Sequence, residues 1–120
     1  MKLAAYLAEP RDELENDFIN KLTAANNMFY LGCTDEKVEG RWMWASDGTP
    51  VTWTNWMVRG AGREDEPNGG TEENCAVMLK QTGSGERAGA WGDYPCHDTG
   101  EPMIIVCEFG KSYWRIDVLE

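Results

Sequence analysis

Side chains that offer oxygen ligands gather in two stretches of this 120-residue chain. The first stretch contains Glu66-Pro67-Asn68 and then Glu73, and the second contains Asp93. A hard cation such as Ca²⁺ takes roughly six to eight oxygens from carboxylates, amide carbonyls, backbone and water. If the fold brings the two stretches together, four side chains are candidate ligands for one ion. They are Glu66, Asn68, Glu73 and Asp93.

The cysteines bear on whether the two stretches meet. The chain has four, at positions 33, 75, 96 and 107, and four cysteines allow three connectivities. A Cys75–Cys96 disulfide would join the stretches, because each of these cysteines adjoins one of them, and closing such a loop contributes about 3 kcal/mol. An acidic loop that is merely fixed by a disulfide fits the same residues. A Cys/His zinc site is not favoured, since the chain has no Cys-x-x-Cys pair and one histidine, His97.

The charge and the apolar runs exclude two classes of partner. With 21 acidic and 11 basic residues the net charge is −10, whereas nucleic acids are bound by basic surfaces. No run approaches the roughly 18–20 apolar residues of a membrane span, so we expect no membrane insertion. Disulfides form in oxidising compartments, which favours a secreted or extracellular protein. The start of the chain is a poor signal peptide, because Glu9-Pro10 and a charged segment follow at once, so we expect a mature or excised domain.

The elements that must position these residues are one helix and several short strands. Leu14, Phe18 and Leu22 recur every four residues, with Ile19 beside them, and this apolar stripe predicts an amphipathic helix over residues 10–27. Residues 57–74 are polar and glycine-rich, and so long a stretch with almost nothing to bury is typically functional or disordered. A helix followed by strands indicates an α+β protein, and the chain length fits one domain. Strands are predicted over residues 28–33, 51–56, 75–79 and 103–109.

The C-terminal end predicts a hairpin. Gly110-Lys111 separates residues 103–109 from residues 112–119, and a Gly-X pair suits a two-residue type II′ turn. We therefore expect these two segments to pair as antiparallel strands.

Taken in order, these residues resemble the C-type lectins. The sugar-binding core of that family is similar to Glu66-Pro67-Asn68, to Glu73 two residues before Cys75, and to Trp91-x-Asp93 three residues before Cys96. The run over residues 34–42 is similar to the mannose-binding collectins. Further landmarks in matching order are Phe29-Tyr30-Leu31-Gly32, Trp44-Ala45-Ser46-Asp47-Gly48, Asn55-Trp56 and Val106-Cys107-Glu108. The resemblance covers about residues 3–109 and leaves 110–120 as an extra C-terminal strand.

The resemblance implies a fold and an activity. The implied fold is a C-type lectin-like domain over residues 1–120, with a helix, small antiparallel sheets and a long calcium-binding loop region. The implied activity is calcium-dependent carbohydrate binding, in which two vicinal hydroxyls of a sugar coordinate Ca²⁺ directly. In the family, Glu-Pro-Asn favours mannose, N-acetylglucosamine or fucose, and a cis peptide bond precedes its proline. The four candidate ligands would then hold both the ion and the sugar.

The same resemblance implies a binding protein and not an enzyme. Paired carboxylates such as Glu66 and Asp93 occur in glycosidases, but an accompanying asparagine and proline have no role in general acid–base chemistry. The implied partner is a mannose-type glycan, and the implied setting is a secreted protein that can form oligomers.

Gly92 departs from the family pattern, which has asparagine at this position. The change removes one side-chain calcium ligand and one hydrogen-bond donor to the sugar, so we expect weaker or altered sugar binding. It also keeps an alternative function open, that of a C-type-lectin-like domain that binds a protein or surface ligand without sugar.

An auxiliary calcium site of some family members is matched only in part. One acidic ligand of that site falls at Gly69, and an asparagine replaces an aspartate. A charged turn is the alternative interpretation of the acidic residues concerned. The residues of the auxiliary site are Asp35, Glu39, Glu73 and Asn74.

Three further departures concern the ends and one loop. We expect this chain to lack the opening strand and first helix of the family, and with them the helix cysteine that would pair with Cys107. Residues 112–119 resemble that opening strand, moved to the other end of the chain. Cys33 either bonds to Cys107 or remains a buried free thiol. Residues 59–65 are longer than the family's approach to Glu66, and they form either a mobile surface loop or an extension of the sugar platform.

Overall fold

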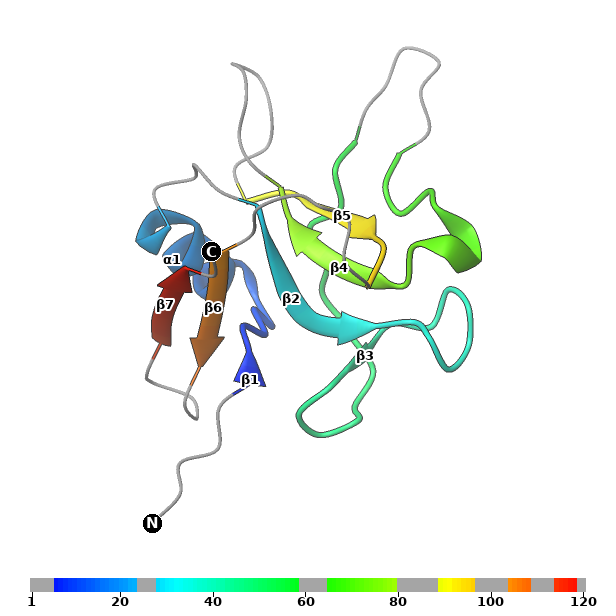
Figure 1. Cartoon of the computed structure of the whole chain (residues 1–120), viewed down its shortest axis with the longest axis horizontal. Helices are drawn as coiled ribbons and strands as arrows, with labels where there is room; N and C mark the ends of the chain where they lie inside the picture. Colours follow the sequence, from blue (N-terminus) through cyan, green and yellow to red (C-terminus); the bar gives the residue numbers. More distant parts are fainter. Residues whose placement is uncertain are drawn as a thin grey trace.

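One helix and seven strands form the regular structure in the part of the chain that the computed structural model describes, which is residues 6–23, 28–58, 65–79, 89–96, 104–108 and 114–118. In Figure 1, strands β1, β6 and β7 lie to one side of β2, and strands β4 and β5 lie to the other. The elements are β1 (Tyr6–Leu7), α1 (Glu13–Leu22), β2 (Phe29–Thr34), β3 (Met43–Trp44), a 3-10 turn (Gly70–Glu72), β4 (Cys75–Met78), β5 (Trp91–Tyr94), β6 (Ile104–Glu108) and β7 (Trp114–Val118). This arrangement is the predicted α+β class.

Helix α1 is shorter than the predicted span of residues 10–27. It begins after Asp12, whose side chain accepts a hydrogen bond from the backbone N–H of Glu15 at 2.8 Å and so caps the first turn. It ends at Leu22, and Thr23 donates its backbone N–H to the carbonyl of Ile19. No helix among the described residues is long and apolar enough to cross a membrane.

Of the predicted apolar stripe of α1, only Ile19 is buried. Leu14 is 81% exposed and Phe18 is 50% exposed, whereas Ile19 and Asn16 are buried. The polar Asn16 lies inward because its amide donates to the carbonyl of Gly89 at 3.1 Å and its oxygen accepts from the indole N–H of Trp91 at 2.8 Å. Two hydrogen bonds therefore anchor the helix through Asn16, a polar residue outside the predicted stripe.

The sheet contains seven strands in the order β1-β6-β2-β4-β5, with β3 paired to β2 and β7 paired to β6. Most pairs are antiparallel, as predicted, but β2 and β6 are parallel neighbours. Strands β4 and β5 pair in one continuous register that sets Val77 opposite Gly92 and Ala76 opposite Asp93. This register connects the two stretches that carry the candidate ligands.

Trp91 fixes strand β5 in the core. Its side chain is fully buried, and the rings of Trp44, Trp53 and Trp56 pack edge-on against it at 6.3, 5.8 and 5.6 Å between centroids. Its backbone N–H donates to the carbonyl of Asn55 and its carbonyl accepts from Met57, both at 2.8 Å. Gly92 and Asp93 thus follow a residue that is held by its ring and by its backbone.

The predicted C-terminal hairpin strands pair as expected. Strands β6 and β7 are antiparallel, from Ile104 opposite Val118 to Glu108 opposite Trp114. The turn at Gly110-Lys111 lies outside the described residues. Strand β6 also pairs with β1, where Leu7 lies opposite Cys107.

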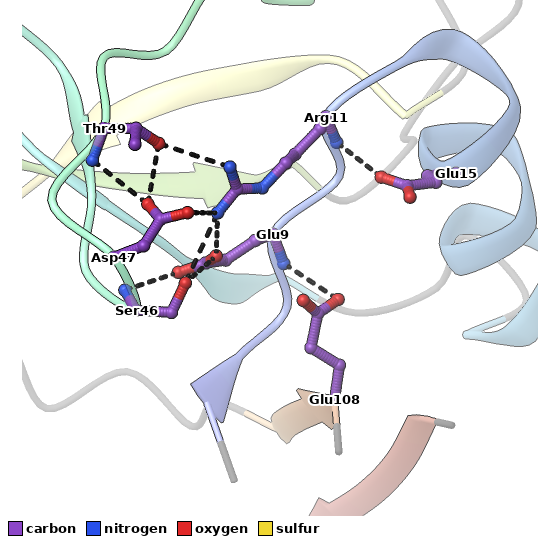
Figure 2. Close-up of polar contacts among 7 residues, drawn as sticks. All are labelled: Glu9, Arg11, Glu15, Ser46, Asp47, Thr49 and Glu108. Carbon is purple, nitrogen blue, oxygen red and sulfur yellow. Dashed lines mark hydrogen bonds and ion pairs between the residues drawn. The ribbon is translucent and has the colours of Figure 1, made fainter. Parts of the chain in front are cut away.

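The segment before α1 is joined to the turn after β3 by a buried carboxylate (Figure 2). Glu9 is 2% exposed, and it accepts hydrogen bonds from the backbone N–H and the hydroxyl of Ser46. It also accepts a hydrogen bond from the guanidinium of Arg11 at 2.8 Å. A pocket of about 330 Å³ lies beside these three residues, and Glu15 and Glu108 line it as well.

Arg11 extends this network to the rest of the turn (Figure 2). Its guanidinium donates to the carboxylate of Asp47 at 3.1 Å and to the hydroxyl of Thr49 at 3.3 Å. It also lies 5.2 Å from the ring centre of Trp44, within the range of a cation–π contact. Since Trp44 packs against Trp91, the network supports the residues on which strand β5 rests.

We expect Arg11→Ala to destabilise the fold, because it removes a charged donor from the buried Glu9 carboxylate. An under-satisfied buried polar group costs about 1–3 kcal/mol. Arg11→Lys should recover only part of this, since an ammonium lacks the planar fork of donors. Chemical unfolding curves measure the effect, and Arg41→Ala, at an exposed arginine, is the matched control. Equal stability of the Arg11→Ala and Arg41→Ala variants would contradict the assigned role.

Candidate functional site

The two stretches of candidate ligands are joined covalently. Cys75 and Cys96 form a disulfide with 5.2 Å between their Cα atoms, which confirms the predicted pairing. No disulfide joins Cys33 to Cys107, so the alternative in which they bond to each other is not realised. Burial, followed by the charges of Glu9 and Asp35, raises the pKa of the Cys33 thiol and keeps it protonated.

Asp93 holds the first stretch against strand β5. It is 4% exposed, and its two carboxylate oxygens accept hydrogen bonds from the backbone N–H groups of Asn68 at 2.9 Å and Gly69 at 2.8 Å. The peptide bond between Glu66 and Pro67 is cis, as the family resemblance implied. The fold therefore brings Glu66-Pro67-Asn68 next to Asp93.

Glu66 lies over the backbone of strand β5. Its side chain is largely buried at 8% exposure, and its backbone N–H donates to the carbonyl of Met57 at 2.9 Å. One carboxylate oxygen, Oε1, lies 2.7 Å from the point where a Cβ atom of residue 92 would stand. The contact between Glu66 and Gly92 was not predicted from the sequence, since residues 26 positions apart carry no local pattern.

Glu73 lies against Gly69 in the same loop. A Cβ atom on Gly69 would overlap the Glu73 side chain. Burial, then the charges of Asp93 and Glu72, raise the pKa of the Glu73 carboxyl above its ordinary value. Of the four candidate ligands, Asn68 is the exposed one.

A second group of oxygens surrounds Asp35 and Asn74. Asp35 is 2% exposed, and its Oδ2 atom accepts a hydrogen bond from the backbone N–H of Gly40 at 2.9 Å. Its Oδ1 atom and the Oδ1 atom of Asn74 are also buried, but neither accepts a hydrogen bond from any residue that the structure describes. Buried acceptors without donors are rare in folded proteins and destabilising, so both atoms are suited to a cation.

Glu39 belongs to the same group. Its pKa is raised by loss of solvation, then by a hydrogen bond with Asp35 and by the charges of Asp35 and Asp93. The residues of the predicted auxiliary site therefore lie near one another, and the charge of Asp93 acts on both groups of oxygens. Gly69, where the family has a further acidic ligand, contributes no side chain.

A third cluster does not form a metal site. Glu36 lies near the sulfur atoms of Cys75 and Cys96. Both sulfurs are in the disulfide and cannot act as thiolate ligands. Residues 59–64 and His97 lie outside the described residues, so the predictions for that loop stay predictions.

Comparison with known proteins agrees with this arrangement. The family described as "Lectin C-type domain" matches residues 1–109. Mannose-binding protein of Gallus gallus is 35% identical over 107 residues, which are 89% of this chain and 36% of that protein. Pulmonary surfactant-associated protein D of Sus scrofa is 35% identical over 106 residues, which are 86% of this chain and 24% of that protein.

A solved structure also resembles the chain. The mouse scavenger receptor C-type lectin carbohydrate-recognition domain aligns with a TM-score of 0.57 and 30% sequence identity. The alignment covers 78% of this chain and 65% of that one. The chain belongs to the C-type lectin family, and the fold is that of a C-type carbohydrate-recognition domain. It spans about a third or less of the length of the two curated relatives above.

The raised pKa of Glu73 predicts how metal-free stability depends on pH. A carboxyl whose pKa is higher in the folded chain than in the unfolded chain binds its proton more tightly when folded. The Glu73 carboxyl therefore stabilises the fold while it is protonated. This contribution to the free energy of unfolding is lost as the pH rises from the ordinary pKa of 4.5 through the raised pKa.

The Glu73→Gln variant isolates this contribution, because glutamine does not titrate. We expect the melting temperature of the wild type in chelator to fall, relative to that of Glu73→Gln, as the pH is raised from 4.5 towards neutrality. A difference in melting temperature between the two proteins that stays constant over this pH interval would contradict the prediction.

Proposed function

We propose that this domain binds mannose-type sugars through a Ca²⁺ ion held by Glu66, Asn68, Glu73 and Asp93. The observation that carries the proposal is the pair of hydrogen bonds from Asn68 and Gly69 to Asp93, which bring both oxygen-rich stretches to one end of strand β5. Carboxylate and amide oxygens are the ligands that Ca²⁺ prefers. When bound, the ion would supply coordination to sugar hydroxyls, while the side chains orient them by hydrogen bonds.

The charge balance of the site supports a cation. Glu66 and Asp93 are both buried, and Glu73 is half-buried with a raised pKa. Gathered carboxylates repel one another, and a divalent cation removes this repulsion. The same reasoning extends to a second ion at Asp35, Glu39, Glu73 and Asn74, since two oxygens there are buried without donors among the described residues.

The sugar class is inferred from the Glu66-Pro67-Asn68 sequence and from the mannose-binding relative. A carboxylate acceptor at position 66 and an amide donor at position 68 suit the equatorial vicinal hydroxyls of mannose. We further infer that the domain works outside the cell as part of a secreted protein, and that it acts as a binding module with no catalytic step.

Gly92 favours a second candidate function. Without a side chain at this position, the site lacks one amide oxygen for the ion and one donor for the sugar. A domain of this fold that binds a protein or surface ligand without sugar is the alternative. A glycan array run with calcium and again with EDTA separates the two, because only the sugar-binding reading predicts a signal that chelation removes.

Calcium should stabilise the folded chain. A ligand that binds only the folded state at about 100-fold above its dissociation constant contributes about 2.7 kcal/mol. Thermal melting in EDTA and in excess calcium measures the difference. We expect Glu73→Gln to reduce the response and Glu13→Gln, on the exposed start of α1, to preserve it. A wild-type melting temperature that is the same in both buffers would count against the site.

Exchanging the two specificity residues should change the preferred sugar. Glu66→Gln combined with Asn68→Asp reverses the positions of amide and carboxylate while both positions keep an oxygen for the ion. A hydrogen bond to a charged group contributes about 1.5–3 kcal/mol, so we expect the preference to shift towards galactose by about tenfold or more. Inhibition by free mannose and free galactose measures the shift. A wild type that binds calcium but neither sugar would support the alternative function.

A further inference from the structure

We propose that the outer edge of strand β7 is an interface at which two copies of this chain pair, so that one sheet continues into the other. The proposal goes beyond the proposed function, because it concerns assembly and needs neither calcium nor sugar. Strand β7 (Trp114–Val118) pairs with β6 along one edge, and no other described strand pairs with it. The second edge of such a strand carries backbone N–H and C=O groups that another strand can bond.

Strand β7 lies at the end of the sheet. In Figure 1 it lies on the side of β6 that is away from β2, so its second edge is directed away from the other strands. Its sequence suits a strand, since tryptophan, isoleucine and valine are enriched in strands. Proteins commonly protect an edge strand with lysine or proline, and β7 contains neither residue.

The charges of β7 are self-complementary in an antiparallel pair. A two-fold axis at Ile116 sets Arg115 of each copy opposite Asp117 of the other. The same axis sets the two copies of Ile116 opposite each other, and it sets Trp114 opposite Val118. Directly opposite residues of antiparallel strands interact, and opposite charges there stabilise the pair. A second copy of this chain is therefore the partner that the strand fits.

The neighbouring registers are disfavoured by the same charges. Opposite residues must lie on the same face of the sheet, so strands related by a two-fold axis change register in steps of two residues. A step in one direction sets the two copies of Arg115 opposite each other, and a step in the other direction does this to Asp117. Like charges directly opposite each other are destabilising. One register thus combines pairing of the whole strand with favourable charges.

Pairing with β6 does not use these two charges. In the register of β6 and β7, Arg115 lies opposite Cys107 and Asp117 lies opposite Ile105. Neither of the β6 residues is charged at neutral pH. Exchanging the charges of β7 therefore creates no like-charge pair with β6, which allows the interface to be tested without altering the charge pairing inside the chain.

We expect a weak dimer that depends on protein concentration. The net charge of −10 opposes association of two copies. A pairing of five residues is also small beside the roughly 1,200–2,000 Å² that a stable interface buries. Helix α1, which exposes Leu14 and Leu22, lies at the same end of the longest axis as β7 in Figure 1 and adds apolar surface there.

The dimer would leave both candidate calcium sites accessible. Asp93 is part of β5, and β5 and β7 lie at opposite ends of the sheet. In Figure 1, β5 lies on the far side of β2 from β7. Pairing at β7 therefore places the two candidate sites at the outer ends of the dimer, where one assembly presents two binding sites.

Sedimentation equilibrium of the wild-type chain, over a range of protein concentrations, measures the dimer directly. We expect a monomer–dimer equilibrium with the same dissociation constant in EDTA and in calcium, because β7 is remote from β5. A wild type that stays monomeric at millimolar concentration overturns the proposal, and so does a dimer that forms only with calcium. A dimer that persists in a denaturing, non-reducing gel is held by a disulfide, and this result also overturns it.

Exchange of the two charges tests the register. Arg115→Asp sets aspartate opposite aspartate in the dimer, and Asp117→Arg sets arginine opposite arginine. We expect each single variant to raise the dissociation constant by about tenfold or more. The double variant restores opposite charges and should return the constant to near that of the wild type. Arg41→Asp is the matched control, since it makes the same change of net charge as Arg115→Asp at an exposed arginine outside the strands.

A mixture of the two single variants gives a second result. Their strands are complementary to each other, so an equimolar mixture should form heterodimers although each variant alone dimerises poorly. Melting in EDTA verifies that each variant is folded. Single variants that dimerise as tightly as the wild type overturn the proposal, as does a double variant that dimerises as poorly as the single variants.

Amide hydrogen exchange of the wild type supplies a test that needs no variant. As the protein concentration is raised, we expect slower exchange in Trp114–Val118 and unchanged exchange in Trp91–Tyr94 of strand β5. Slower exchange in β5 with none in β7 would place the interface elsewhere and overturn the proposal.

Discussion

The two hydrogen bonds that Asp93 accepts from the backbone of Asn68 and Gly69 are the interaction on which the rest of the site depends. They use both oxygens of a buried carboxylate to hold a polar, glycine-rich loop against a regular strand. Hydrogen bonds to an ionised acceptor are stronger than those between neutral groups, and a loop with few apolar residues has little else to hold it. The Cys75–Cys96 disulfide adds a covalent constraint close by, but it leaves the orientation of residues 66–69 undetermined. Asp93 therefore determines the shape of the loop before any ligand is considered.

That shape depends in turn on support from distant parts of the chain. Strand β5 begins at Trp91, whose ring packs against three other tryptophans and donates a hydrogen bond to Asn16 of helix α1. Trp44, one of the three, lies beneath the guanidinium of Arg11, which pairs with the buried Glu9. Polar contacts that seem remote from the site thus limit the movement of the strand that carries Gly92 and Asp93.

The region gathers carboxylates and buried acceptor oxygens, which a cation would stabilise. Glu39 and Glu73 both have raised pKa values, and the charge of Asp93 contributes to each. The Oδ1 atoms of Asp35 and Asn74 are buried, and neither accepts a hydrogen bond from a described residue. Such an arrangement destabilises the metal-free fold, because like charges repel and buried acceptors lose water without gaining a donor. Membership of the C-type lectin family makes calcium the natural candidate for such a cation.

The order and type of residues determined the family, the α+β class, the Cys75–Cys96 disulfide and the cis bond before Pro67, because each depends on local spacing that the family shares. The two hairpin strands at the C-terminus were predicted from the Gly110-Lys111 pair, which suits a tight turn. The burial of Asn16 in α1 did not follow, since Asn16 lies inward only because Trp91 and Gly89 offer it partners from far along the chain. Likewise, the burial of Glu9 was not predicted, because it depends on Ser46, which only the fold brings beside it. The contact between Glu66 and Gly92 was also decided by tertiary structure, because the space above a glycine exists only once another segment is packed against it.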